Sequence, residues 1–277
     1  MRRRLLLFAF LSALFVPATS NASPILFAST GFSAELYSIN VATQTATLVG
    51  STGVGRMGGL DFNSSGVLYG IAGGSIGPAS LYTINTTTGA ATFVGTLSGV
   101  QGADGLAFDS ADNLYAGAWT GSSGALVTLN AATGAILTNT TLSGSGNSFV
   151  VGLDFDAANQ LWGSRGNSGG SAEDLVKVNI ATGVLTAVGG NFRTISGIWF
   201  AADGTLYAIS TSGEVLTIDP TTGAQTLLFS TGIANLSGLT GQDTTAVPEP
   251  VSLVLLGSGL MGLAARRRRL ARPGVRR

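Results

Sequence analysis

Hydrophobic and polar positions alternate in short runs along most of the chain, and one phrase recurs at a nearly constant distance. The phrase reads Gly-Leu/Ile-x-Phe, and each copy lies in a run rich in apolar and β-branched residues, which predicts a β-strand. The chain is therefore a repeat array. Full copies begin at Gly59, Gly105, Gly152 and Gly197, and a truncated copy begins at Gly238, so the spacings are 46, 47, 45 and 41 residues.

Each copy of the phrase opens a set of four predicted strands. A short polar turn leads to the second strand, a variable Gly/Ser loop to the third, and a turn of the form Asn/Asp-x-x-Thr-Gly to the fourth. In that turn the Asn or Asp side chain caps the backbone, and the glycine takes the positive φ that closes a hairpin. The turn occurs at residues 85–89, 130–134, 179–183 and 219–223, and an earlier copy has Gln44 in place of the glycine.

Four strands in about 45 residues is the period of a β-propeller blade. Residues 24–50 supply strands two to four of one further blade that lacks its first strand. The strand predicted around residues 236–239 fits that vacant position, where it would close the ring and remove a sheet edge. We therefore predict an all-β propeller of about five four-stranded blades, with the ring closed by a C-terminal strand in the first blade. An elongated β-solenoid, or a propeller with another blade count, is the alternative.

The repeated phrases resemble those of NHL-type and gluconolactonase-like propellers in their general pattern. The resemblance concerns the fold alone and assigns no chemistry.

The first 22 residues have the pattern of a secretory signal peptide. Three arginines at positions 2–4 precede a 12-residue apolar run at 5–16, and small residues follow. The small-x-small sequence at 20–22 predicts cleavage between Ala22 and Ser23 after export through the Sec translocon. Twelve apolar residues are fewer than the roughly 20 that span a bilayer, which disfavours the alternative of an uncleaved anchor.

The C-terminus carries a second targeting pattern. Pro248, Glu249 and Pro250 precede 15 mostly apolar residues at 251–265, and an arginine cluster follows at once. By the positive-inside rule the arginines keep the far end of the apolar run in the cytoplasm, so we expect transient inner-membrane insertion with the domain outside. The cluster consists of Arg266, Arg267, Arg268 and Arg269.

In this order of elements the C-terminus resembles the PEP-CTERM sorting signal of Gram-negative bacteria. The resemblance implies recognition by an exosortase, a membrane protease-transferase that cuts near Pro-Glu-Pro and releases or attaches the domain outside the cell. It also implies a bacterium that makes extracellular polysaccharide, as in a biofilm. A simple C-terminal membrane anchor is the alternative. The chain thus divides into a signal peptide at 1–22, a repeat domain at 23–243 and a sorting signal, with a transmembrane-like helix, at 244–277.

Charge changes this picture because the two ends hold most of the basic residues. The chain has 277 residues with 14 basic and 14 acidic side chains, so its formal net charge is zero. Between Ser23 and Val247, however, four basic residues face 13 acidic ones, which gives the repeat domain a net charge of −9. An acidic domain disfavours binding to nucleic acid.

The chain contains no Cys and no His. This excludes disulfides, a thiolate nucleophile, Cys-ligated metal centres and every Ser-His-Asp triad. A hydrolase or lyase built on this propeller would need a metal and a Glu, and the repeat domain has few Glu residues. We therefore expect a protein that is not an enzyme.

Variable loops mark the candidate binding face. Connections from the second to the third strand, and from the fourth to the first, vary in length, whereas the other two classes are short and nearly fixed. In a four-stranded meander these classes lie on opposite faces, so the variable face is the candidate binding surface. It includes residues 75–79, 119–124, 165–173 and 191–196.

Four side chains on this face form the candidate ligand site. A tryptophan stacks on a sugar face, and arginines pair with the carboxylates of an acidic polysaccharide. The alternative, which we favour, is that the tryptophan fills a gap between blades and the arginines pair with local acids. The four candidates are Arg56, Trp119, Arg165 and Arg193. By contrast, repetition at one position of the second strand indicates core packing for Tyr69, Tyr115, Trp162 and Tyr207.

Carboxylates near the first strands are a weak candidate for calcium. We expect Asp104 and Ser196 just before the inner strands, close to the mouth of a central channel. Several carboxylates together with backbone carbonyls bind Ca²⁺, but Asp is also ordinary in such turns and no D-x-D-x-D spacing occurs. We expect no metal or other cofactor, with Ca²⁺ at Asp104 as the weak alternative. The remaining acids of these strands and turns are Asp61, Asp109, Asp154, Asp156 and Asp203.

These patterns predict a secreted or surface-sorted, non-enzymatic β-propeller that acts as a binding or structural module of the cell envelope or the extracellular polysaccharide matrix. Its expected partners are an exosortase and the Sec translocon during export, and afterwards a polysaccharide or another surface protein. A metal-dependent propeller enzyme, such as a lactonase-type hydrolase, is the alternative.

Overall fold

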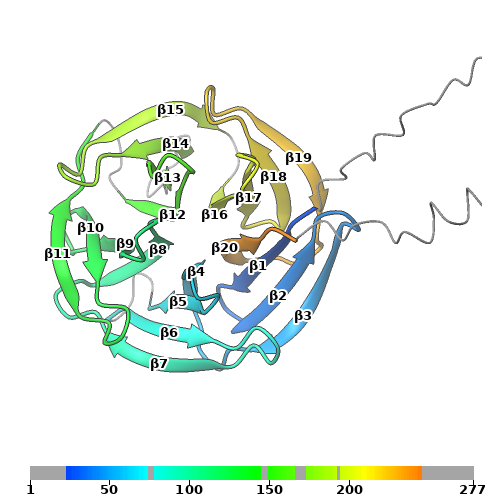
Figure 1. Ribbon diagram of the computed structural model, residues 1–277, viewed down its shortest axis with the longest axis horizontal. Helices are drawn as coiled ribbons and strands as arrows, with labels where there is room; N and C mark the ends of the chain where they lie inside the picture. Colours follow the sequence, from blue (N-terminus) through cyan, green and yellow to red (C-terminus); the bar gives the residue numbers. More distant parts are fainter. Residues whose placement is uncertain (1–22, 74–77, 145–148, 166–172, 192–193, 245–277) are drawn as a thin grey trace, which may run out of the picture. The chain divides into compact units, whose positions relative to one another are not determined.

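Five antiparallel four-stranded sheets surround a central axis in the computed structural model, which describes residues 23–73, 78–144, 149–165, 173–191 and 194–244 (Figure 1). The strands of these ranges form a five-bladed propeller, which confirms the predicted fold class and blade count. Every strand and every core cluster lies within one compact unit, Ser23–Thr244. This unit therefore contains all that the ring requires to fold.

In each blade the inner strand lies beside the axis and the outer strand lies at the circumference. Blade 1 comprises β20 (Leu236–Gln242), β1 (Ile25–Thr30), β2 (Glu35–Asn40) and β3 (Thr45–Ser51). Blade 2 comprises β4 (Met57–Phe62), β5 (Leu68–Ala72), β6 (Ser80–Ile84) and β7 (Ala91–Thr96). Blade 3 comprises β8 (Gly102–Phe108), β9 (Leu114–Trp119), β10 (Gly124–Leu129) and β11 (Ile136–Thr141). Blade 4 comprises β12 (Val150–Phe155), β13 (Leu161–Arg165), β14 (Glu173–Val178) and β15 (Leu185–Asn191). Blade 5 comprises β16 (Ile195–Phe200), β17 (Leu206–Ser210), β18 (Glu214–Ile218) and β19 (Gln225–Ser230).

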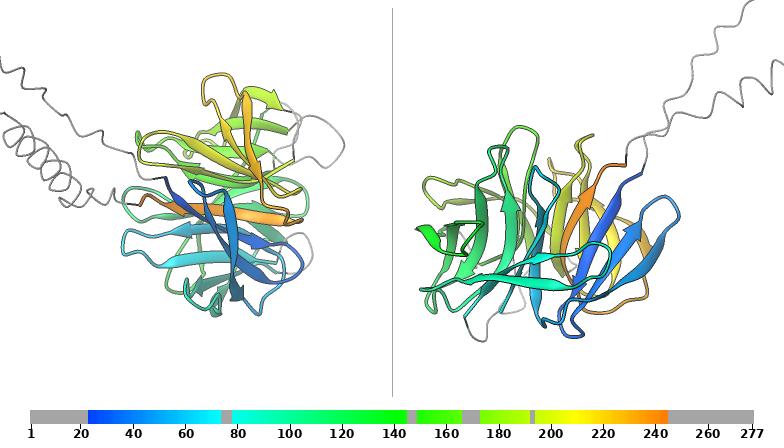
Figure 2. Two further views of the ribbon diagram at one scale, coloured as in Figure 1. Left: turned by 90° about the vertical axis from the view of Figure 1, so that its right-hand side faces the viewer. Right: turned by 60° about the horizontal axis from the view of Figure 1, so that its bottom comes forward.

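The last strand closes the ring as predicted. β20 pairs antiparallel with β1, from Ile25 opposite Gln242 to Thr30 opposite Leu236, and the two strands lie side by side in Figure 2. Leu236 and Leu239 of β20 are buried. The first blade thus combines the two ends of the domain, and the inner edge of its sheet is covered by a strand from the far end of the sequence.

The glycine of the repeated phrase lets neighbouring inner strands approach each other closely. A Cβ at Gly59 would lie 2.3 Å from the carbonyl oxygen of Asp104, and one at Gly197 would lie 2.5 Å from the amide nitrogen of Leu239. Distances below 3.0 Å leave no space for a side chain, so only glycine fits. As a result, the inner strands leave no room for a water molecule between them at this level of the axis.

Each inner strand contains a β-bulge at the same point. The pairing register shifts there by one residue, and the extra residue is Gly58, Asp104, Val151, Ser196 or Gly238 in the five inner strands. The prediction that Asp104 and Ser196 precede the inner strands is therefore wrong. They lie inside β8 and β16, because each strand begins before the predicted start. The bulge lets the strand accommodate one extra residue, Asp104 or Ser196, and turns the side chain of that residue.

The Asn/Asp-x-x-Thr-Gly turn behaves as expected and has a further role. The Asn85 side-chain oxygen accepts hydrogen bonds from the amides of Thr87 and Thr88, and Gly89 has a φ of 79°. A Cβ on Gly89 would also lie 2.6 Å from the backbone of Gly50 at the end of β3. The glycine thus serves both the hairpin and the contact between adjacent blades.

The repeated aromatic residues of the second strand are packing residues, as predicted. Tyr115, Trp162 and Tyr207 are buried, and Tyr69 packs against a core cluster. Three of the four contact the phenylalanine of the phrase in the next blade, for example Tyr69 with Phe108, at a ring-centroid distance of 5.2 Å. These pairs join neighbouring blades.

Candidate functional site

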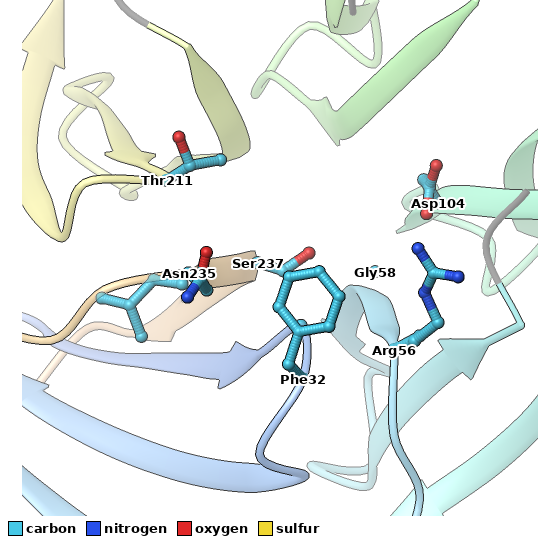
Figure 3. A pocket seen from close by; sticks show the side chains of 9 residues that line it. Phe32, Arg56, Gly58, Asp104, Thr211, Asn235 and Ser237 are labelled. Atoms are coloured by element: carbon cyan, nitrogen blue, oxygen red, sulfur yellow. The ribbon is translucent and has the colours of Figure 1, made fainter.

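A cavity of about 210 Å³, which we call the mouth pocket, opens on the variable face. Both variable loop classes contribute to it (Figure 3). The β1–β2 and β17–β18 loops join second to third strands, and the β3–β4 and β19–β20 connections join fourth to first strands. The bulge of β8 completes the lining. Its lining residues are Gly31, Phe32, Arg56, Gly58, Asp104, Thr211, Asn235, Leu236 and Ser237. The pocket therefore collects side chains from blades that are distant in the sequence.

Arg56 is held in an unusual backbone conformation at the edge of the pocket. Its φ is 59°, which is uncommon for a residue with a side chain. Its amide donates a hydrogen bond to the carbonyl of Gly31 (2.9 Å), and its carbonyl accepts one from Gly73 (3.3 Å). The guanidinium carbon lies 5.7 Å from the ring centroid of Phe32, within the range of a cation–π contact. These contacts fix the guanidinium beside an aromatic ring.

Asp104 supplies the negative charge of the pocket. A Cβ on Gly58 would lie 2.5 Å from the Asp104 Oδ1 atom, so the missing side chain of Gly58 makes room for the carboxylate. Burial raises the pKa of Asp104, and the positive charge of Arg56 opposes that rise. Figure 3 shows the Arg56 side chain reaching toward Asp104. The pocket thus contains one cation and one anion that partly neutralise each other.

Neutral polar groups line the opposite side of the pocket. The Asn235 backbone, with a φ of 59°, donates a hydrogen bond to Thr211 (2.7 Å) and accepts one from Gly31 (2.8 Å). Within the ranges that the structure describes, the side-chain polar groups of Thr211, Asn235 and Ser237 form no hydrogen bond with the protein. Their hydroxyl and amide groups therefore remain available to a ligand.

Of the four residues predicted for the ligand face, Arg56 lines the mouth pocket, where it lies beside Asp104, the residue of the calcium alternative. Trp119, at the end of β9, makes an edge contact with Phe149 at 6.2 Å, so it packs between blades as the favoured alternative states. Arg165 ends β13 and is only 8% exposed. Neither lines the mouth pocket.

The aromatic residue of the pocket is Phe32, which the sequence patterns do not single out. It is 71% exposed and follows a glycine in the β1–β2 loop. A large apolar residue in a variable loop otherwise made of small residues is the signal that points to it.

The buried aspartates Asp61 and Asp154 connect inner strands. Asp61 accepts hydrogen bonds from the amides of Phe62 (2.8 Å) and Phe108 (2.6 Å) and from the Thr240 hydroxyl (3.0 Å). Asp154 accepts one from the amide of Phe200 in the next blade. Burial raises the pKa of Asp61 to about 7. Burial, and secondly the charge of Asp61, raise the pKa of Asp154 well above its ordinary value.

Other acids of the calcium hypothesis act locally. Asp109 accepts hydrogen bonds from the amides of Ala111 and Asn113, and Asp156 accepts one from the Trp162 indole (2.9 Å). Asp203 accepts one from the amide of Thr205. No group of three or more Asp or Glu side chains suited to a metal ion occurs in the described ranges.

Several predicted residues lie outside the described part of the chain. In the ranges that are described, no helix has the length and apolarity needed to cross a bilayer. The signal peptide, most of the sorting signal and one candidate arginine are not covered: Ala22, Arg193, Pro248, Glu249, Pro250, Arg266, Arg267, Arg268 and Arg269.

Two family models match the chain. One, described as a repeat of unknown function (DUF6923), matches residues 27–249 and so spans the propeller except for its first four residues. The other, the PEP-CTERM protein-sorting motif, matches residues 246–269. The second match confirms the resemblance drawn from the C-terminal sequence. No curated protein matches the chain.

Solved structures similar to this chain have the same architecture. A chain of a nidogen/laminin complex is 13% identical with a TM-score of 0.53, over 79% of this chain and 98% of that one. A protein of unknown function from Bacteroides caccae is 11% identical with a TM-score of 0.51, over 80% and 100%. Another from Bacteroides thetaiotaomicron is 17% identical with a TM-score of 0.52, over 76% and 56%. At these identities the likeness shows the fold alone.

Proposed function

The chain belongs to the family described as a repeat of unknown function (DUF6923), and we propose that this member is a non-enzymatic binding module whose mouth pocket takes one sugar unit of an extracellular polysaccharide. One observation carries the proposal. An exposed aromatic ring, a guanidinium and a carboxylate from three separate segments meet in a single pocket on the variable face.

The sorting motif gives the setting of this function. The PEP-CTERM motif at residues 246–269 implies processing by an exosortase and export to the bacterial cell envelope or surface. We extend this to a Gram-negative cell in which the Sec translocon exports the chain and the signal peptide is removed between Ala22 and Ser23. At that surface, polysaccharide is an abundant ligand.

Replacing Pro248, Glu249 and Pro250 with alanine is expected to leave a larger, membrane-retained form of the protein. The motif would no longer be cut, while the apolar run and its arginines would still hold the chain in the membrane. Immunoblots of membrane and surface fractions from an exosortase-bearing host measure this. Ser252→Ala, which lies in the same tail, is the control. Unchanged processing of the triple variant would refute exosortase recognition at this site.

The chemistry of the mouth pocket supports a sugar as the ligand. A pyranose presents C–H groups that stack on an aromatic face, and hydroxyls that bond to charged and amide groups. Phe32 supplies the ring, Arg56 and Asp104 supply charged hydrogen-bonding groups, and Asn235 and Ser237 supply neutral ones. A cavity of about 210 Å³ has the scale of a single sugar ring rather than an oligosaccharide.

The same pocket gives little support to catalysis. Among the described residues that line it, Arg56 and Asp104 are the ones with ionisable side chains, and they lie close enough for their charges to interact. The hydroxyls of Thr211 and Ser237 have no imidazole to activate them, because the chain has no His. A site that recognises hydroxyls without transferring a proton fits these groups best.

Phe32→Ala and Arg56→Ala are each expected to weaken sugar binding by roughly ten- to a hundred-fold, since hot-spot truncations cost about 1.4–3 kcal/mol. A glycan array of neutral and uronate-containing oligosaccharides, followed by calorimetry with the best-bound probe, measures this. Phe93→Ala and Lys177→Ala change exposed residues of the same types outside the pocket and are the controls.

Three results would contradict the proposal. The first is an array without binding, and the second is an equal loss of binding in the control variants. The third is lactone hydrolysis by the purified propeller that Asp104→Asn abolishes, because that would make the pocket an active site.

A further inference from the structure

The five outer strands, β3, β7, β11, β15 and β19, form a rim of free sheet edges. Each is the last strand of its sheet, so within the sheet it is paired on one side only (Figure 1). Only the first residues of β7 and β15 bond to the neighbouring blade among the described strands of the rim: the amide of Ala91 donates to the Thr52 carbonyl and that of Leu185 to the Ser143 carbonyl. A free edge presents a row of backbone N–H and C=O groups to any other strand. Soluble proteins usually protect such edges with charged side chains, proline or covering loops.

The rim carries no charge although the domain is acidic. The outer strands read TATLVGS, ATFVGT, ILTNTT, LTAVGGN and QTLLFS, without a single Asp, Glu, Lys, Arg or Pro. Each of the other strand classes contains charged residues, for example Asp61 in an inner strand, Arg165 in a second strand and Glu35 in a third. The most exposed strands of the propeller are therefore the ones that lack charge.

The rim instead exposes apolar side chains among threonines. Leu48 is 51% exposed, Phe93 58%, Leu137 63% and Leu227 46%, and each lies on a different outer strand. Thr47, Thr92, Thr138 and Thr226 lie on the same strands and are exposed. β-Branched and apolar residues of this kind favour strand pairing.

A bulge limits how strong any one edge contact can be. The register between the third and outer strands shifts in every blade, as between Leu36 and Tyr37 of β2. In β3 the regular stretch is then 45–48. Such short edges pair weakly alone, but five of them on one ring allow several contacts at once.

We propose that the rim binds further copies of this chain edge to edge, so that the propellers associate laterally at the cell surface. Charge and symmetry are the reasons to expect a second copy of this chain, rather than another protein, on the rim. Two copies of a domain with a net charge of −9 repel each other, and this repulsion is smallest where the uncharged rims face each other, because the charged side chains then lie farthest from the contact. An antiparallel pair of identical edges is also self-complementary, with threonine and aliphatic groups on both sides.

Sedimentation velocity of the propeller, residues 23–244, tests this. The wild type is expected to associate as its concentration rises. A rim variant with Leu48→Lys, Phe93→Lys, Leu137→Lys and Leu227→Lys is expected to be monomeric at the same concentrations, with association weakened more than about tenfold, because charged side chains on an edge strand block edge pairing.

The control variant carries Val67→Lys, Ala111→Lys, Ala158→Lys and Ala202→Lys, four exposed positions of the short turns after the inner strands. It makes the same change in net charge away from the rim, so it is expected to associate at least as well as the wild type. A wild type that stays monomeric, or a control that dissociates as fully as the rim variant, would overturn the proposal.

Hydrogen exchange on the wild type supplies a test that needs no variant to fold. Amides of β3, β7, β11 and β19 are expected to exchange more slowly as concentration rises, while those of the short turns keep their rate. Slower exchange on the pocket face instead would place self-association elsewhere and refute the rim as the interface.

Discussion

A propeller that ends before Leu236 is expected to lose its cooperative fold, whereas one that ends after Thr244 is expected to keep it. The difference between the two chains is essentially β20, Leu236–Gln242, the strand that supplies the inner position of blade 1. Without it, β1 would be left with an unpaired edge beside the axis.

The loss is large because β20 contributes to packing and to hydrogen bonding. Leu236 is fully buried and Leu239 is 3% exposed, and burial lost at each such leucine costs about 2–5 kcal/mol. Removing both therefore costs roughly 4–10 kcal/mol, against a typical total stability of about 5–15 kcal/mol. Two hydrogen bonds are lost as well: the one that the Thr240 hydroxyl donates to Asp61, and the one that the Ala202 amide donates to the Asp243 carboxylate.

Circular dichroism and calorimetric melting of the chains 23–235 and 23–244 measure this. The shorter chain is expected to show no cooperative melting transition and to aggregate. Cooperative melting of the shorter chain at nearly the same temperature as the longer one would mean that the ring does not depend on its closing strand.

The closing strand also shows why the fold was predictable from the sequence. Each blade is encoded locally, by the phrase that begins at Gly59 and its copies, and by the turn exemplified by residues 85–89. The N-terminal blade lacks a first strand in the sequence, and the C-terminal end of the domain has one additional first strand. Together these two features specify how the ring closes. Repetition thus carries the long-range information that a single copy of the pattern lacks.

The site was less predictable because it depends on contacts between blades. Phe32, Arg56 and Asp104 belong to three segments that meet only once the ring closes. Arg56 and Asp104 were candidates by residue type, but the bulge that turns Asp104 into the pocket shifts a strand by one residue, which periodicity does not reveal. Trp119 had the better residue type for a sugar, yet it packs against Phe149.

The role of the buried aspartates was also hidden in the sequence. Asp61 and Asp154 have the same place in the repeated phrase, next to its phenylalanine, and nothing local distinguishes them from turn aspartates. Their bonding partners lie in the neighbouring inner strands. Because burial raises their pKa, we expect the stability of the propeller to depend on pH.

Propeller stability is expected to rise as the pH falls from about 7 to about 4. Burial raises the pKa of Asp61 from an unfolded value of 3.8 to about 7, so within that window the folded chain binds a proton that the unfolded chain releases. Stability from such a group is fully present below the unfolded pKa and is lost as the pH rises through the folded one. Asp154, whose pKa is raised by burial and by Asp61, acts in the same direction.

This rise in stability at lower pH is large enough to be distinguished from ordinary acid denaturation, which lowers stability. A shift from 3.8 to about 7 corresponds to a few kcal/mol, on the order of 4, or roughly 10 °C in Tm for a domain of this size. Carboxylates whose pKa is lowered by hydrogen bonds, such as Asp203 and Asp219, act in the opposite sense, but mainly below pH 4. Above pH 4, the aspartates whose pKa is raised by burial, Asp61 and Asp154 together with Asp104, therefore decide the slope.

Thermal melting from pH 8 to pH 4.5 measures this slope. Asp61→Asn is expected to reduce it, because the amide has no proton to bind and because the loss of the Asp61 charge removes the second cause that raises the pKa of Asp154. Asp219→Asn is the matched control: it makes the same change in an exposed turn, where Asn85, Asn130 and Asn179 serve in other blades. A wild-type Tm that falls steadily on acidification would contradict the raised pKa. A slope that Asp61→Asn leaves intact would assign the pH dependence to another group, since the charge of Asp61 would then play no part in it.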